Sequence, residues 1–86
     1  MKINCYSVYD AVAKCYTAPF NMLNDDVAIR TMANCVNDPQ HNYSLNPTDY
    51  TLFKVGEFDD NEGTYEPKHE QVTNLNNLAI RNDAGE

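Results

Sequence analysis

The feature that most constrains the fold of this chain is the segment 50–66, which predicts a β-hairpin. Its first part, YTLFKVGEF (50–58), is rich in aromatic and β-branched residues and has no helical period, so it predicts a strand. The sequence DDNEG (59–63) supplies a turn that contains glycine, and residues 64–66 begin the return strand. A hairpin of this kind requires a sheet that it can join.

Strand alternation assigns the side chains of this first strand to two faces. It places Tyr50, Leu52 and Phe58 on one face, and Phe53 and Val55 on the other. Because both faces carry apolar side chains, we expect this strand to lie inside the sheet rather than at its edge.

The N-terminal segment 2–9 predicts another strand. Alternation places Ile3, Cys5 and Tyr9 on one face, and Tyr6 and Val8 on the other. Residues 14–17 predict a short second strand that would complete an N-terminal hairpin. The alanine-rich sequence DAVAKCY (10–16) is also compatible with a helical turn, and the sequence leaves both open.

The segment 24–36 predicts an amphipathic helix. Asn24 is a suitable N-cap, and two aspartates follow it at the positive end of the helix dipole. Pro39 lies shortly after the predicted end. The apolar stripe consists of Ile29, Met32, Ala33 and Val36. A stripe of this width packs on a sheet, and we expect Met32 to be buried against Leu52 or Phe53.

These elements predict an α+β fold, with a small, mostly antiparallel sheet packed against the one helix. We assign residues 1–66 to a single domain and residues 67–86 to a polar, acidic tail. The tail is predicted to be either unstructured or a short helix, because the spacing of its few apolar residues is only weakly helical.

Length and charge restrict the possible partners. A chain of 86 residues has room for one small core. No stretch is long and apolar enough to predict a membrane-spanning segment, so we expect no association with a membrane. The net charge is −7, of which residues 59–86 carry −5. Strong binding to duplex DNA requires clustered Lys and Arg, which the sequence lacks.

No motif predicts an enzyme, a metal site or a cofactor. Three widely spaced cysteines indicate reduced thiols rather than a disulfide framework or a zinc site. The DDNEG turn places Gly63 fifth from Asp59, whereas an EF-hand loop needs glycine at the sixth position. Cys35 and His41 have no third residue at a suitable spacing to form a catalytic group, and there is no glycine-rich phosphate loop.

The six tyrosines are the most distinctive group of side chains. Aromatic rings on an exposed sheet face can stack unpaired bases, and lysines on or beside the strands can contact phosphates. The alternative is that most tyrosines border the core with their hydroxyls in water. The residues predicted to bind nucleic acid are Lys2, Tyr6, Lys14, Tyr16, Tyr50 and Lys54.

A series of short motifs resembles a known viral family. In order, they are YSVYD (6–10), APF (18–20), NDDVAIR (24–30), VNDP (36–39) and NPTDYTLFKVGEFDD (46–60), followed by the Gly63 turn. Together these motifs resemble the small nonstructural protein of gokushoviruses, which are single-stranded DNA phages of the Microviridae. The similarity covers about residues 1–67, and it is the combination of motifs that is specific.

The resemblance implies a protein that is made in the cytoplasm of the host bacterium and is not a virion component. It also implies a non-enzymatic accessory role in viral DNA replication or single-strand synthesis, with weak single-stranded DNA binding. The alternative is an interaction module that targets a phage or host replication protein without touching nucleic acid. A third interpretation is an assembly factor. We also expect a homo-oligomer, because unpaired sheet edges favour self-association.

Overall fold

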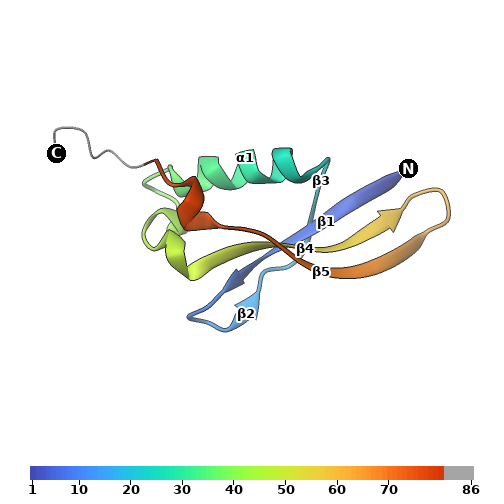
Figure 1. The fold of residues 1–86 in the computed structure, drawn as a ribbon, viewed down its shortest axis with the longest axis horizontal. Helices are drawn as coiled ribbons and strands as arrows, with labels where there is room; N and C mark the ends of the chain where they lie inside the picture. The colour runs from blue at the N-terminus through green and yellow to red at the C-terminus, as the bar shows by residue number, and fades with distance from the viewer. Residues whose placement is uncertain (81–86) are drawn as a thin grey trace.

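The computed structural model describes residues 1–80 and has one long helix packed on a five-stranded antiparallel sheet (Figure 1). The predicted α+β fold is therefore confirmed. The elements in order are β1 (Lys2–Asp10), β2 (Cys15–Tyr16), β3 (Phe20–Met22), α1 (Asp25–Val36), the 3-10 helices η1 (Asn42–Ser44) and η2 (Pro47–Asp49), β4 (Tyr50–Asp59), β5 (Thr64–Asn74) and the 3-10 helix η3 (Leu75–Leu78).

The sheet is built around β1 and β4, which pair with each other along almost their whole length. On its other side β1 pairs with β2 near its C-terminal end and with β3 near its N-terminal end. The strand β5 pairs only with β4 and forms an edge of the sheet. The strand predicted at residues 50–58 thus lies inside the sheet, as expected.

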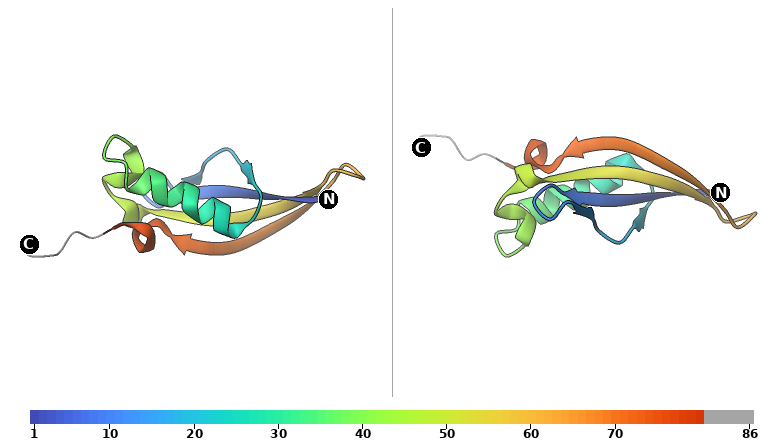
Figure 2. Two further views of the ribbon diagram at one scale, coloured as in Figure 1. Left: turned by 90° about the horizontal axis from the view of Figure 1, so that it is seen from above. Right: turned by 90° about the horizontal axis from the view of Figure 1, so that it is seen from below.

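The helix α1 begins and ends as its sequence predicts. The Asn24 side chain accepts a hydrogen bond from the Val27 amide at 2.9 Å and so caps the first turn. The two predicted acidic residues lie in that turn. Viewed from above, α1 lies across the sheet, and viewed from below it lies behind the sheet (Figure 2). One face of the sheet is therefore covered by the helix and the other is not.

The core lies between α1 and this covered face. The helix contributes Ala28, Met32 and Val36, and Met32 belongs to the same buried cluster as Leu52, as predicted. The remaining members of the cluster are Tyr6, Val8 and Leu75. None of the helices within residues 1–80 has the length and hydrophobicity needed to cross a membrane.

A β-bulge interrupts the pairing of β1 with β4. Cys5 lies opposite Gly56, but its neighbour Tyr6 lies opposite Lys54, so Val55 is an extra residue on β4. An extra residue shifts the alternation of every side chain beyond it.

The bulge changes the face on which Phe58 lies. Phe58 pairs with Ile3. Ile3 is three residues from the core residue Tyr6, so the two side chains point to opposite faces of the sheet. Ile3 and its partner Phe58 therefore lie on the uncovered face. The prediction that Phe58 shares a face with Leu52 is therefore wrong.

The N-terminal hairpin is confirmed, although β2 has only two residues. The helical alternative for residues 10–16 is wrong, because residues 11–14 form the turn between β1 and β2. Asp10 holds this turn through its Oδ1 atom, which accepts hydrogen bonds from the amides of Val12 at 2.9 Å and Ala13 at 3.2 Å.

The ordered fold extends beyond Glu66, where the sequence predicted a tail. The strand β5 continues to Asn74, and Leu75 at the start of η3 is fully buried. The η3 turn agrees with the short-helix alternative, whereas the part of the predicted tail at residues 81–86 lies outside the described residues. Removing the chain from Pro67 onward would delete most of β5 and part of the core.

We predict that Met32→Ala lowers the free energy of unfolding by about 2–5 kcal/mol, because it leaves a cavity between α1 and the sheet. Denaturant unfolding measures this change. Asn34→Ala, at an exposed position on the same helix, is the matched control and should leave stability nearly unchanged. Equal unfolding midpoints for Met32→Ala and the wild type would mean that the helix does not pack as described.

Candidate nucleic-acid interface

Four aromatic rings from four strands meet in one cluster, which we call the aromatic platform: Tyr9 of β1, Tyr16 of β2, Phe53 of β4 and His69 of β5. The ring centroids are 4.7 Å apart for Tyr9 and Tyr16, and 5.5 Å apart for Tyr16 and Phe53. The Phe53 and His69 rings are nearly parallel, with centroids 4.8 Å apart. The platform therefore crosses the sheet from one edge to the other.

The platform lies on the sheet face that α1 does not cover. Tyr9 follows the core residue Val8 in β1, and Phe53 follows the core residue Leu52 in β4, so both rings point away from the core. Tyr16 is 43% exposed, and His69 is also exposed. The Tyr16 hydroxyl and His69 Nε2 form a hydrogen bond of 2.8 Å, which fixes the two outermost rings relative to each other.

A second aromatic pair lies on the same face toward the β4–β5 turn. Phe58 and Tyr65 are directly opposite each other on β4 and β5, and they are 37% and 50% exposed. The Tyr65 hydroxyl donates a hydrogen bond to the Val55 carbonyl oxygen at 2.8 Å, so the ring lies across Gly56. A Cβ atom at position 56 would overlap the Tyr65 hydroxyl. Glycine thus permits the close approach of the ring to the backbone, and any larger residue would require the ring to move.

The predicted site residue Tyr6 is not available for stacking. Its side chain is fully buried in the core, and its hydroxyl donates a hydrogen bond to Asp25 Oδ1 at the start of α1. Burial, followed by the hydrogen bond and the charge of Asp25, raises the pKa of Tyr6. The assignment of Tyr6 to a nucleic-acid site is therefore wrong, because alternation alone could not tell which face α1 covers.

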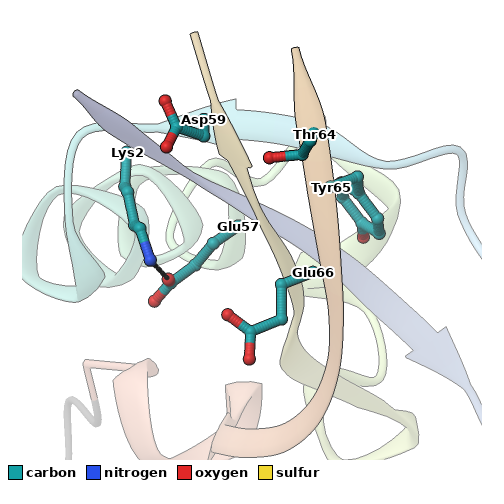
Figure 3. A pocket seen from close by; sticks show the side chains of 6 residues that line it. All are labelled: Lys2, Glu57, Asp59, Thr64, Tyr65 and Glu66. Carbon is teal, nitrogen blue, oxygen red and sulfur yellow. Dashed lines mark ion pairs between the residues drawn. The ribbon is translucent and has the colours of Figure 1, made fainter. Parts of the chain in front are cut away.

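The predicted lysines Lys2 and Lys54 both lie beside Glu57 rather than on the platform. Lys54 Nζ is 3.1 Å from Glu57 Oε2, and Lys2 Nζ is 4.0 Å from Glu57 Oε1. Figure 3 shows the Lys2 amino group pointing toward the Glu57 carboxylate. The hydrogen bond from Lys54 lowers the pKa of Glu57, to which the charges of Lys68 and Lys2 also contribute. Lys54 is paired with Tyr6, so it lies on the helix side of the sheet.

The other three predicted residues lie near the β1–β2 turn. Tyr16 is part of the platform, and Lys14 is exposed in the adjacent turn with a left-handed backbone (φ 59°). Tyr50 is half-buried and packs on Tyr43, with ring centroids 4.6 Å apart. The structure therefore brings only Tyr16 of the predicted set into the platform.

Three platform residues were not predicted from the sequence. Tyr9 and Phe53 each follow an apolar residue in a predicted strand, Val8 and Leu52 respectively. If those apolar residues had been assigned to the core, alternation would have placed both aromatic rings on the opposite, exposed face. His69 lies in the segment that was predicted to be a tail, so it had no strand to be placed on. Its only signal was an aromatic ring beside Lys68 in a polar segment.

Within residues 1–80, Cys5 is buried, Cys35 is half-buried and Cys15 is exposed. No group of three or more His, Cys, Asp or Glu side chains is arranged to hold a metal ion in this part of the chain. Burial raises the pKa of the Cys5 and Cys35 thiols, which disfavours the reactive thiolate.

Comparison with known proteins places the chain in a viral context. The family model described as Phage ORF5 protein matches residues 3–79, from the start of β1 to just after η3. This match is consistent with the resemblance to the gokushovirus nonstructural protein and extends beyond residue 67, where that resemblance ended. No curated protein and no solved structure shows significant similarity to the chain.

We predict that Gly56→Ala displaces the Tyr65 ring from the sheet, because the new Cβ atom occupies the position of the hydroxyl. A double-mutant cycle with Tyr65→Ala measures this dependence. Gly56→Ala should be more destabilising in the wild type than in the Tyr65→Ala background, with a coupling energy of about 0.5–3 kcal/mol. Additive effects would contradict the close approach of the ring to Gly56.

We also predict that the stabilising effect of the Tyr6 hydroxyl is lost at high pH. The folded state raises the pKa of Tyr6, whereas an unfolded tyrosine has a pKa of about 10. This contribution is therefore fully present below about pH 10 and declines as the pH rises further, because the unfolded state then releases the proton more readily. Comparing the unfolding free energies of the wild type and Tyr6→Phe from pH 7 to 11 tests this. A difference that does not shrink above pH 10 would contradict the prediction.

Proposed function

The chain belongs to the Phage ORF5 protein family, and from this premise we propose that it is a non-enzymatic accessory protein in viral DNA replication or single-strand synthesis. It would act in the cytoplasm of the infected bacterium and bind single-stranded DNA weakly through the aromatic platform. The observation that carries the proposal is the cluster of four rings, two of them exposed (Tyr16 and His69) and two half-buried (Tyr9 and Phe53), that crosses four strands on the face away from α1.

Stacking is the interaction that this face supports best. Unpaired bases stack on exposed aromatic side chains with about 1–3 kcal/mol per base, and this contribution tolerates any sequence. Phe58 and Tyr65 lie on the same face further along the sheet, so a strand that follows β4 would meet aromatic rings at both ends of its path.

The charge distribution predicts that binding depends only weakly on salt. Lys2 and Lys54 are beside Glu57, and Lys54 faces the helix side, so neither neutralises phosphates on the platform. Two further basic residues lie near platform residues in the sequence: Lys14 is two residues before Tyr16, and Lys68, whose charge acts on Glu57, directly precedes His69. With about one or two phosphate contacts, the slope of log K against log salt would be only about −1 for single strands.

The second candidate function is an interaction module for a phage or host replication protein. The net charge of −7 favours this alternative, because it repels DNA at long range. The same exposed aromatic rings would then contact a protein surface, since aromatic residues are enriched at protein interfaces.

The sequence also predicted self-association, but the edge of β5 is a poor surface for it. It contains Pro67 and pairs with β4 through two register shifts, and both features discourage strand addition.

The test is a titration of the full chain with fluorescently labelled single strands at two salt concentrations. We predict that Tyr16→Ala weakens binding about 5- to 100-fold, because it removes one stacking ring. Tyr16→Phe keeps the ring and should bind nearly as the wild type does. Leu45→Ala, which also removes exposed apolar surface but lies in the loop between η1 and η2, is the control and should have no effect.

Two results would contradict the proposal. Binding that Tyr16→Ala leaves unchanged would place the DNA on another surface. Absence of binding at low salt, in a chain shown to be folded, would replace the DNA interpretation with the protein-partner alternative.

A further inference from the structure

A pocket at one end of the sheet is lined by groups that suit a single unpaired base. It lies where the β1–β2 turn meets η1 and the start of β4, and its volume is about 260 Å³. This is just below the range typical of sites for drug-sized ligands, so it suits a smaller planar group. The lining residues are Asp10, Cys15, Tyr16, Thr17, Asn42, Tyr43 and Tyr50.

The apolar part of the pocket is aromatic. Tyr43 and Tyr50 pack on each other with centroids 4.6 Å apart and an interplanar angle of 43°. His41 also packs on Tyr43, with ring centroids 4.6 Å apart, and helps to hold that ring in place. Burial raises the pKa of Tyr43 further above the physiological range. Rings held in this way provide a preformed surface for stacking.

The polar part of the pocket favours a hydrogen-bond donor and disfavours an anion. Asp10 is half-buried, and its Oδ1 atom is occupied by the turn amides of Val12 and Ala13. This leaves Oδ2 to accept a hydrogen bond from a ligand. Among the lining residues, all within the described part of the chain, there is no Lys or Arg to bind a phosphate. A carboxylate in base recognition typically accepts from an exocyclic amino group, such as N4 of cytosine.

Tyr16 connects this pocket with the aromatic platform. It lines the pocket and also packs against Tyr9 and Phe53 on the uncovered face. Asp10 and Tyr50 have the same alternation as the core residues Val8 and Leu52, so they lie on the helix side of the sheet. A strand stacked on the platform would therefore reach the pocket by passing round the edge of the sheet at Tyr16.

We propose that the pocket takes up one unpaired base with an exocyclic amino group from a strand that lies on the platform, with Asp10 accepting the hydrogen bond from that amino group. The inference rests on the proposed function and adds to it a preference for cytosine over thymine, which carries a carbonyl oxygen at the same position.

The experiment compares the affinity of short dC and dT oligonucleotides for the wild type and for Asp10→Asn. We expect the wild type to bind dC about tenfold more tightly than dT. Asp10→Asn keeps Oδ1 for the turn but presents an amide donor to the pocket, so the preference should be abolished or reversed while dT binding is retained. Its melting curve should match that of the wild type, which separates a binding effect from misfolding.

Asp38→Asn is the matched control. Asp38 Oδ1 accepts a hydrogen bond from the Gln40 amide at 3.0 Å, so this variant also removes one negative charge from a turn-capping aspartate, but outside the pocket. It should keep the preference for dC.

Equal binding of dC and dT by the wild type would overturn the pocket proposal and leave the proposed function intact. Failure of both oligonucleotides to bind would overturn both proposals.

Discussion

The packing of α1 on one face of the sheet is the constraint on which the rest of the structure depends. Residues 1–80 contain a single long helix, and that helix can bury only one face of a five-stranded sheet. Tyr6, Val8 and Leu52 supply the buried side chains on the covered face. The uncovered face must remain compatible with water, and tyrosine and histidine meet this requirement because each combines an apolar ring with a polar group.

The elements with a strong local signal were predictable from the sequence. The helix at Asp25–Val36 was predicted almost to the residue, because Asn24 caps it and its apolar stripe has a clear helical period. The central strand was predicted because its residue types favour the β conformation. By contrast, β5 has many charged and polar residues with little alternation, since an edge strand buries little of itself. Its continuation to Asn74 depends on pairing with β4 and on the burial of Leu75, and these tertiary contacts leave no local pattern.

The candidate site was less predictable than the fold, because it depends on which face each side chain occupies. Alternation correctly separated Tyr6 from Tyr9, but it could not say which of them α1 would cover. The bulge at Val55 then moved Phe58 to the uncovered face. A one-residue shift of this kind reverses the face of all the following side chains and has no marker in the sequence other than the nearby Gly56.

The separation of charge from aromatic surface gives the proposed binding mode its selectivity. Lys2 and Lys54 are beside Glu57, so the exposed rings are the main attraction that the uncovered face offers to DNA. In a duplex the bases are already stacked and paired inside the helix, and their faces are not accessible to a protein ring. A single strand exposes those faces. A protein that binds by stacking, with few phosphate contacts, therefore discriminates against duplex DNA without any element that recognises the duplex. Its acidic charge strengthens this discrimination, because the duplex has the higher density of phosphates.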